Sequence, residues 1–261
     1  MSMKDVYISG SSGFIGKELL RQLRGHNIVG GDRLGSVHKH FDYLFNLATY
    51  GNYHDQHDIQ QIYDANLMLP MALLRNASGI EYEAFVTVST SSVTLPYQTF
   101  YSQAKLAMEG VCQVWARDSG KPICIARPYS VTGPGEQPRH LIPTLIRSCL
   151  KGEEVKLDPD PVHDFIDVRD FVSGLICIAE HARNHRGEIF SVGSGTQFTN
   201  KHILDLVEQA TKKKANVVMT GPQRVYDTDV WVSDNTKIKK LGWEPKIKLV
   251  DTIKDMVQHE R

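Results

Sequence analysis

Short apolar runs alternate with longer segments along the first half of the chain. The short runs predict buried strands, and they lie at residues 6–9, 27–30, 43–48, 84–89 and 123–126. The longer segments repeat apolar side chains with helical spacing, which predicts amphipathic helices at residues 16–24, 59–77 and 100–118. Pro70 lies inside the second of these, so we expect a kink or a helix start there. Strands that alternate with helices predict an α/β fold, with a Rossmann-like, doubly wound parallel sheet.

The pattern changes after Arg127, where a loop rich in proline and glycine begins. The predicted elements beyond this loop are shorter and mixed. We therefore expect a first domain over residues 1–127 and a small α/β region over residues 128–261. Residues 163–192 are expected to return in part to the main sheet.

Composition narrows the classes of function. The chain has 30 Lys and Arg against 30 Asp and Glu, so its formal charge is zero, which argues against nucleic-acid and membrane-surface partners. No apolar run approaches the roughly 20 residues of a membrane span, and residues 1–6 lead straight into the first predicted strand, so we expect no secretory signal. The 4 cysteines form no C-x-x-C pair, which indicates reduced thiols and a cytoplasmic protein. The 11 histidines show no recognisable metal-binding spacing, so we expect no metal.

The first predicted strand and helix are joined by a glycine-rich turn, Gly10-Ser11-Ser12-Gly13-Phe14-Ile15-Gly16. Gly10 permits a tight turn, Gly13 lets a pyrophosphate approach the helix N-terminus, and Gly16 lets helix and strand pack closely. Ordinary βα turns also contain glycines, but the flanking elements favour a dinucleotide site. At the end of the second strand, Asp32 can bind an adenosine ribose, which favours NAD, whereas Arg33 suits the 2′-phosphate of NADP.

Tyr101 and Lys105 stand four residues apart on one face of a predicted helix. A nearby ammonium favours the phenolate and should lower the pKa of Tyr101 toward working pH. Such a tyrosine can exchange a proton with a substrate alcohol while hydride moves to or from a nicotinamide. The preceding strand ends in four hydroxyl residues, 89–92, and one of them could hold the reacting oxygen.

These features together resemble the extended short-chain dehydrogenase/reductases, and in particular the NAD-dependent epimerase/dehydratase family, which acts on nucleotide sugars. The glycine turn matches the family's dinucleotide turn, and Tyr101 and Lys105 match its acid/base pair. When the strand is aligned without gaps from Phe85, Thr90 takes the place of the family's catalytic hydroxyl, and Ser91 is the reserve candidate.

The resemblance implies NAD as the cofactor, with NADP as the alternative. Asn46-Leu47-Ala48-Thr49 resembles the family's H-L-A-A, whose backbone lines the nicotinamide side, and Asn66 matches the asparagine of the next helix. In the family the lysine also binds the nicotinamide ribose. The implied cofactor contacts are Gly10, Ser12, Gly13, Phe14, Ile15, Gly16, Asp32, Arg33, Leu47, Ala48, Thr49, Asn66, Val88, Tyr101, Lys105, Pro128 and Val131.

The second half carries the family's substrate motifs. Residues 127–134 resemble R-P-F-N-V-Y-G-P, residues 163–170 resemble R-D-F-I-H-V-D-D, and residues 224–245 resemble the closing R-P-G-D … D … L-G-W-x-P. The family's arginine at the position of Arg224 grips the nucleotide pyrophosphate. The resemblance thus implies that residues 1–127 form the dinucleotide-binding domain and that residues 128–261 mainly bind the substrate. The implied substrate contacts are Thr90, Ser130, His163, Arg224 and Asp227.

Departures from the family bear on the reaction. Ser130 and His163 replace the usual asparagine and arginine, which alters the pyrophosphate grip. Ser91 and Ser92 stand where 4,6-dehydratases have Asp-Glu, so water elimination lacks its usual carboxylates. The resemblance then implies a nucleotide-sugar 4-epimerase, in which NAD takes hydride from C4 and returns it to the other face, with Tyr101 as the acid/base.

Two other readings stay open. A 4-keto-sugar reductase of deoxysugar or O-antigen biosynthesis is one, since residues 48–53, with Asn66 and Pro70, resemble such reductases. A non-catalytic dinucleotide-binding regulator is the other, although it would be expected to lose Tyr101 or Lys105, and both are present. No G-x-S-x-G motif of a serine hydrolase occurs. Family members often pair through the helix that carries the tyrosine, so a homodimer is expected by analogy alone.

The chain is 261 residues long, which is short for the family. Between Asp32 and Tyr43, a few residues replace what is usually helix, strand and helix. A crossover to the far side of the first strand needs roughly 10–12 residues, which leaves no room for another strand. We therefore predict that the second strand is the sheet edge and that the adenine pocket is open. A second shortening lies between Thr90 and Tyr101.

Overall fold

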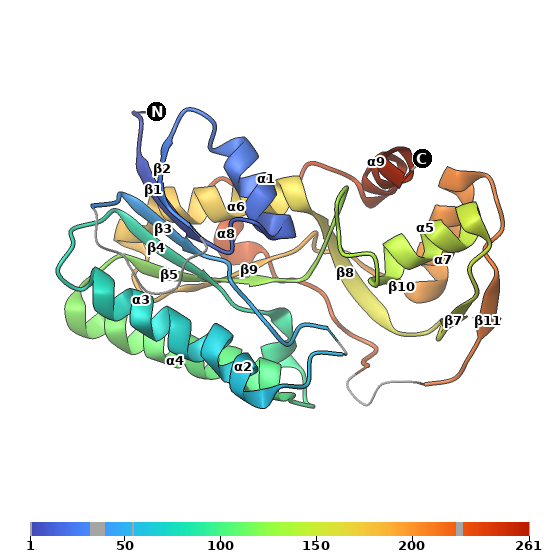
Figure 1. Cartoon of the computed structure of the whole chain (residues 1–261), viewed down its shortest axis with the longest axis horizontal. Coiled ribbons are helices and arrows are strands. Elements are labelled where there is room, and N and C mark those ends of the chain that lie inside the picture. Colours follow the sequence, from blue (N-terminus) through green and yellow to red (C-terminus); the bar gives the residue numbers. More distant parts are fainter. Residues whose placement is uncertain (1, 32–39, 54, 223–226, 261) are drawn as a thin grey trace. The chain divides into compact units, whose positions relative to one another are not determined.

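The computed structural model describes residues 2–31, 40–53, 55–222 and 227–260 (Figure 1). The chain divides into two compact units. The first contains Met1–Pro128, Val172–Ser191 and Thr236–Trp243, and the second contains Tyr129–Phe171, Val192–Asn235 and Glu244–Arg261. No helix in the described ranges combines the length and the apolar character needed to cross a membrane.

A six-stranded sheet lies at the centre of the first unit. Its strands, in spatial order, are β2 (Asn27–Gly30), β1 (Asp5–Ser9), β3 (Tyr43–Asn46), β4 (Ala84–Val88), β5 (Ile123–Pro128) and β9 (Ile189–Val192). The pairs β1–β2, β1–β3, β3–β4 and β4–β5 are all parallel. The predicted Rossmann-like parallel sheet is therefore confirmed.

Strand β2 forms one edge of this sheet, and no strand among the described residues pairs with its outer side. The next strand, β3, pairs with the other side of β1, with Tyr43 opposite Val6. This is the arrangement that the short connection after Asp32 predicts. The predicted openness of the adenine pocket depends on residues 32–39, which lie outside the described residues.

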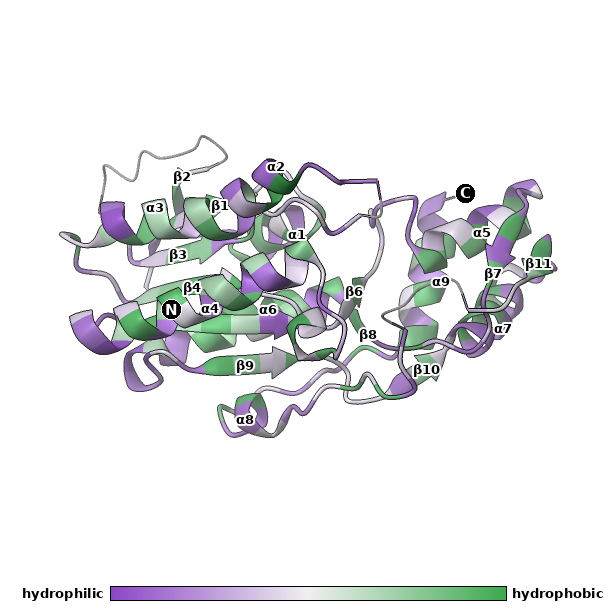
Figure 2. Ribbon diagram, turned by 90° about the horizontal axis from the view of Figure 1, so that it is seen from below, coloured by the Kyte–Doolittle hydropathy of each residue, from purple (hydrophilic) through white to green (hydrophobic). Residues whose placement is uncertain are grey.

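Helices cover both faces of the sheet. Helices α3 (Leu69–Ala77) and α4 (Phe100–Ser119) lie on one face, and α1 (Phe14–Gln22) and α6 (Val168–His181) on the other (Figure 1). Figure 2 shows both hydrophobic and hydrophilic residues along α3 and α4, as expected for helices that bury one side. Their buried side chains pack on the strands in one hydrophobic cluster, which includes Leu44, Leu73, Phe85, Met108 and Ile123.

The helical pattern of residues 59–77 contains three elements rather than one. Helix α2 (Ile59–Tyr63) passes into a π-helical turn, η1 (Asp64–Met68), before α3 begins. Proline cannot donate a backbone hydrogen bond, and its ring crowds the preceding turn. A π-turn directly before α3 accommodates Pro70, the second residue of α3, while the backbone stays helical from η1 into α3. The predicted helix start is thus observed.

The described residues of the second unit form two small sheets and three helices. One sheet has the order β10 (Gln197–Thr199), β8 (Val162–Asp167) and β6 (Ser130–Thr132), and the other pairs β11 (Val217–Met219) with β7 (Val155–Leu157). Helices α5 (Leu141–Lys151), α7 (Asn200–Thr211) and α9 (Leu249–Glu260) supply most of its core, with Leu145, Ile203 and Ile253 fully buried.

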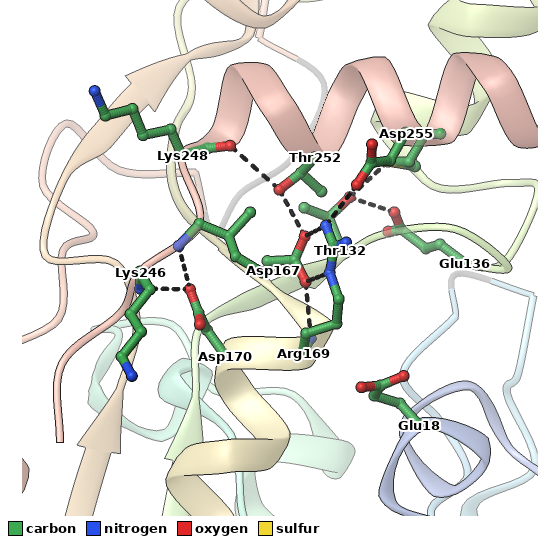
Figure 3. A network of polar contacts seen from close by, with 12 residues as sticks. Glu18, Thr132, Glu136, Asp167, Arg169, Asp170, Lys246, Lys248, Thr252 and Asp255 are labelled. Atoms are coloured by element: carbon green, nitrogen blue, oxygen red, sulfur yellow. Dashed lines mark hydrogen bonds and ion pairs between the residues drawn. The ribbon is translucent and has the colours of Figure 1, made fainter. Parts of the chain in front are cut away.

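Helix α9 is held against the end of β8 by polar contacts (Figure 3). The Asp167 carboxylate accepts from Arg169 Nε at 2.8 Å and from Thr252 Oγ1 at 2.7 Å. Arg169 also reaches Asp255 of α9 at 2.8 Å. Because Asp167 and Thr252 are buried, these contacts satisfy polar groups that would otherwise be costly to desolvate.

The remaining short elements of the chain connect the larger ones. They are η2 (Ser91–Thr94), η3 (Ala182–Asn184) and α8 (Thr236–Lys239).

Candidate active site

The glycine-rich turn between β1 and α1 is packed too tightly for side chains. At Gly10, φ is +78°, and a Cβ there would lie 2.7 Å from the backbone nitrogen of Ala48. A Cβ on Gly16 would lie 2.2 Å from the Gly10 carbonyl oxygen, so this glycine closes the turn on itself. The two glycines bring the start of α1 against the end of β3.

The N-terminus of α1 is available to an anionic group. Its N-cap is Gly13, and no side chain caps the first turn. The first backbone N–H groups of a helix lack partners within the helix and favour negative charge. Ser12 is exposed, and Phe14 and Ile15 are half-buried in that turn. This geometry fits a dinucleotide pyrophosphate, as the sequence predicts.

The carboxyl ends of the central strands are tied together by buried polar side chains. Ser9 Oγ donates to Asn46 Oδ1 at 2.6 Å, and Asn46 Nδ2 donates to Thr87 Oγ1 at 3.0 Å. Leu47 N–H also donates to the Ser9 carbonyl at 3.0 Å. These bonds hold the carboxyl ends of β1, β3 and β4 in register. They therefore also set the positions of the residues that follow these strands. Sequence reasoning did not single out Ser9, Asn46 or Thr87 for this role.

Tyr101 and Lys105 lie in the first turns of α4, which begins with a capping box formed by Thr99 and Ser102. Lys105 is 2% exposed, and its Nζ donates to the Val88 carbonyl at 2.7 Å. The same nitrogen lies 6.0 Å from the centroid of the Tyr101 ring. The predicted pair is therefore adjacent, with the ammonium directed at the end of β4.

Burial shifts the titration of both groups. It raises the pKa of Tyr101, because a buried phenolate is poorly solvated. It lowers the pKa of Lys105 to about 7, because the ammonium is desolvated as well. We expected Lys105 to lower the pKa of Tyr101 below its ordinary value. In the protein without a bound ligand this expectation is wrong. Desolvation dominates, and the ammonium makes its hydrogen bond to the backbone rather than to the phenol.

The hydroxyl groups of Thr49 and Thr90 lie close enough to the Tyr101 phenol to lower its pKa, an effect that is smaller than the opposite effect of burial. Thr90 follows β4, caps η2, and lies 3.0 Å from Ser92 Oγ. Ser91, the reserve candidate, is buried in η2. Thr49 follows β3, and its hydroxyl donates to Asn66 Oδ1 at 2.8 Å. The sequence indicated a role only for the backbone of Thr49, beside the nicotinamide. The motif gave no indication that the Thr49 side chain lies near Tyr101.

A buried ion pair lies behind this site. Glu109 of α4, 2% exposed, accepts from Arg127 Nε at 2.7 Å and from Ser89 Oγ at 2.5 Å. Arg127 NH2 reaches the second oxygen of the same carboxylate at 2.5 Å. In the sequence, Arg127 marks only the start of a loop, and Glu109 belongs to none of the motifs. Together these residues fasten α4 to the ends of β4 and β5.

The predicted substrate residues of the second unit lie on or near its three-stranded sheet. Ser130 and Val131 are half-buried in β6, after Pro128 at the end of β5. His163 of β8 packs against Trp231, with ring centroids 5.0 Å apart. Asp227 is half-buried, whereas Asp32, Arg33 and Arg224 lie outside the described residues. Among the described side chains, no group of three or more His, Cys, Asp and Glu residues is arranged to hold a metal ion.

Comparison with known proteins identifies the family of the chain. The model of the NAD dependent epimerase/dehydratase family matches residues 32–193. The uncharacterized UDP-glucose epimerase YtcB of Bacillus subtilis (strain 168) is 22% identical, with 97% of each chain covered. The GDP-6-deoxy-D-mannose reductase of Pseudomonas aeruginosa is 24% identical over 59% of this chain and 53% of its own. This match thus spans about half the length of that relative.

Among solved structures, MoeE5 in complex with UDP-glucose and NAD superposes with a TM-score of 0.89. The two chains are 23% identical, and the match covers 98% of each. At 23% identity, this similarity is evidence for a shared fold alone.

Proposed function

Because the chain belongs to the NAD-dependent epimerase/dehydratase family of enzymes, we propose that it transfers hydride reversibly at C4 of a nucleotide-linked sugar, as a 4-epimerase. The observation that carries this proposal is the position of the Tyr101 phenol beside the buried Lys105 at the end of β4, with the Thr90 hydroxyl nearby. This combination of acid/base group, hydroxyl and cation suits the interconversion of an alcohol and a ketone.

The cofactor site that we propose uses residues of the first unit. The α1 N-terminus and the Gly10 turn would hold the pyrophosphate, and the ends of β3 and β4 would lie beside the nicotinamide. NAD bound there would supply the acceptor and donor of hydride for the sugar carbon. We retain NADP as the alternative, since Asp32 and Arg33 carry opposite preferences.

The chain's own residues would handle the proton. Thr90 would hold the C4 oxygen by a hydrogen bond. Tyr101 would take the hydroxyl proton when C4 is oxidised, and would return it when the keto group is reduced on the other face. Lys105, with a pKa of about 7, would supply positive charge next to the phenolate that accepts this proton and that forms again when the proton is returned.

Tyr101→Phe tests this proposal directly. The variant should lose at least about 100-fold in turnover, the usual contribution of a positioned general acid/base, because Phe has no proton to exchange. It should still bind NAD, measured by fluorescence or calorimetry, because the glycine turn is unchanged. A Phe variant with wild-type turnover contradicts the assignment. Binding of nucleotides by the wild type without any turnover would favour a regulator.

A 4-keto-sugar reductase is the second candidate. Burial raises the pKa of Tyr101, which favours the proton-donating form, and a reductase needs only a proton donor at this position. The similarity to a GDP-6-deoxy-D-mannose reductase points the same way. The purified protein separates the two candidates: an epimerase holds NAD tightly and needs no added cofactor, whereas a reductase requires added NADPH and a keto-sugar. Ser91 and Ser92 still disfavour a dehydratase.

We also propose a homodimer in the cytoplasm. The surface of α4, together with the residue that follows α3, forms an apolar groove, lined by Ser78, Gly110, Val111, Val114, Trp115, Asp118 and Ser119. An apolar groove along a surface helix suits packing against a second copy. The cytoplasmic location rests on four cysteines that are all free.

A further inference from the structure

We propose that Gln197 is a positioning residue for the substrate site, because its side-chain amide holds the segment that carries Trp231. Its action is indirect and passes through Trp231 to His163, and this role rests on the proposed function. His163 and Asp227 are among the substrate contacts that the sequence predicts, and Trp231 follows Asp227 by four residues. Gln197 belongs to none of the motifs.

The segment around Trp231 is extended but has no strand beside it. Val230 and Val232 are exposed, whereas Trp231 between them is half-buried, which is the alternation of an extended chain with one face turned inward. Among the described residues, no strand pairs with residues 227–235. Backbone N–H and C=O groups on the inward side still need hydrogen-bond partners. Side chains supply them.

Gln197 of β10 supplies two of these partners. Its Oε1 accepts from the Trp231 backbone N–H at 2.8 Å, and its Nε2 donates to the Asp229 carbonyl at 3.1 Å. An N–H needs an acceptor and a carbonyl needs a donor, so the two partners fix which way the amide points. In an extended chain these two groups point to the same side, where a neighbouring strand would bind both. The Gln197 amide therefore takes the place of a peptide group of such a strand.

Asp164 of β8 holds the same segment two residues further on. It is 1% exposed and lies directly opposite Gln197 in the antiparallel pair of β8 and β10, so the two side chains lie on one face of the sheet. Its carboxylate accepts from the Ser233 backbone N–H at 2.9 Å. It also accepts from the backbone N–H groups of Ser194, at 2.7 Å, and Gly195, at 2.9 Å. Two neighbouring side chains thus bind alternate N–H groups of the segment.

The bonds of Gln197 bear on the position of the Trp231 ring. The centroids of the Trp231 and His163 rings are 5.0 Å apart, with 47° between the ring planes. His163 is fixed by the strand β8, whereas the Trp231 backbone is held at this point by the Gln197 amide. Loss of that amide would release the Trp231 backbone from β10, and the surface that Trp231 and His163 form together would change.

Hydrogen exchange of single amides, measured by NMR, tests the first step. In the wild type the Trp231 amide should exchange slowly, although it lies outside regular secondary structure, because it is hydrogen-bonded. Gln197→Met keeps the length of the side chain but can neither accept nor donate, and should speed this exchange at least about tenfold. The Ser233 amide, bound to Asp164, should stay protected.

Gln209→Met is the matched control, since it makes the same change at an exposed position of α7. It should leave the exchange of the Trp231 amide at the wild-type rate. Unchanged exchange of this amide in Gln197→Met would overturn the proposal, as would an equal acceleration in Gln209→Met.

Substrate binding tests the second step, with UDP-glucose as the probe for the NAD-loaded protein. Gln197→Met should weaken its binding about tenfold and leave kcat unchanged, because Tyr101 and Lys105 are not altered. Gln197→Glu keeps an acceptor for the Trp231 N–H and should recover part of the affinity. A lower kcat at unchanged affinity would overturn the proposal. A wild type that binds no nucleotide sugar would overturn the proposed function instead, and the exchange of the Trp231 amide would still decide whether Gln197 holds the segment.

Discussion

At the scale of single residues, burial decides the chemistry of the Tyr101–Lys105 pair. The two side chains are one helical turn apart, but Lys105 Nζ donates to the Val88 carbonyl at 2.7 Å. Removal from water disfavours the charged form of each group, which raises the pKa of Tyr101 and lowers that of Lys105 to about 7. The i, i+4 spacing correctly predicted their proximity. It could not predict desolvation, which depends on what packs around them.

The close packing at Gly10 gives a prediction at the same scale. Gly10→Ala should destabilise the protein and weaken NAD binding, because a Cβ would meet the Ala48 backbone nitrogen at 2.7 Å in addition to the strain of φ +78°. Urea denaturation measures the first effect and calorimetric titration with NAD the second.

Gly120 supplies a matched control. It ends α4 with φ +67°, and nothing lies within 4 Å of a Cβ built on it. Gly120→Ala should therefore show the left-handed strain alone, about 1–2 kcal/mol, and should leave NAD affinity unchanged. If Gly10→Ala and Gly120→Ala lost equal amounts of stability, the contact with Ala48 would contribute nothing to the free energy of unfolding.

At the scale of elements, the position of α4 depends on the buried group of Glu109, Arg127 and Ser89. Val88, the last residue of β4, and Ser89, which follows it, both bind this helix, one through Lys105 and the other through Glu109. An ion pair of this kind contributes little net stability relative to apolar packing, but its orientation fixes the helix. The register of Tyr101 against the strand ends therefore depends on it.

Glu109→Gln should cost about 3 kcal/mol in the free energy of unfolding, because it leaves the Arg127 guanidinium without its charged partner. Urea denaturation monitored by circular dichroism measures this. Asp205→Asn is the control, since it breaks an exposed Lys201–Asp205 pair on α7 and should change stability by less than about 1 kcal/mol. A Glu109→Gln variant as stable as this control would show that the buried pair does not hold α4.

The elements themselves were largely predictable from the chain. Periodic apolar positions gave the strands and helices of the first unit, because a sheet covered on both faces needs apolar strands and one-sided helices. The sequence predicted an interruption of the helix at Pro70. It did not predict that this interruption would be a π-turn. The buried polar residues Glu109, Asn46 and Thr87 carry no motif of their own, and their partners come from distant parts of the sequence.

At the scale of the whole molecule, the apolar groove along α4 supports a prediction about oligomeric state. Val114 is 49% exposed and lines this groove. A charge at this position would be desolvated on dimer formation, and desolvation of an unpaired charge is costly. Val114→Glu should therefore yield monomers.

Sedimentation analysis of the wild type and the variant measures this. Val218→Glu is the control, because Val218 is similarly exposed, at 44%, but lies on β11 outside the groove. The wild type and Val218→Glu should sediment as dimers. A monomeric wild type, or a dimeric Val114→Glu, would contradict pairing through this surface.

The sequence by itself determined the α/β fold, the edge position of β2, and the family with its glycine turn and Tyr101–Lys105 pair. These follow from local spacing, loop length and glycine positions, all of which are properties of neighbouring residues. Only the tertiary structure decided how burial shifts the pKa values of the pair, which hydroxyls lie near Tyr101, and how Asn66 turns its amide toward Thr49. These depend on burial and on contacts between residues far apart in the chain, because a pKa and a hydrogen-bond direction are set by everything that surrounds a group.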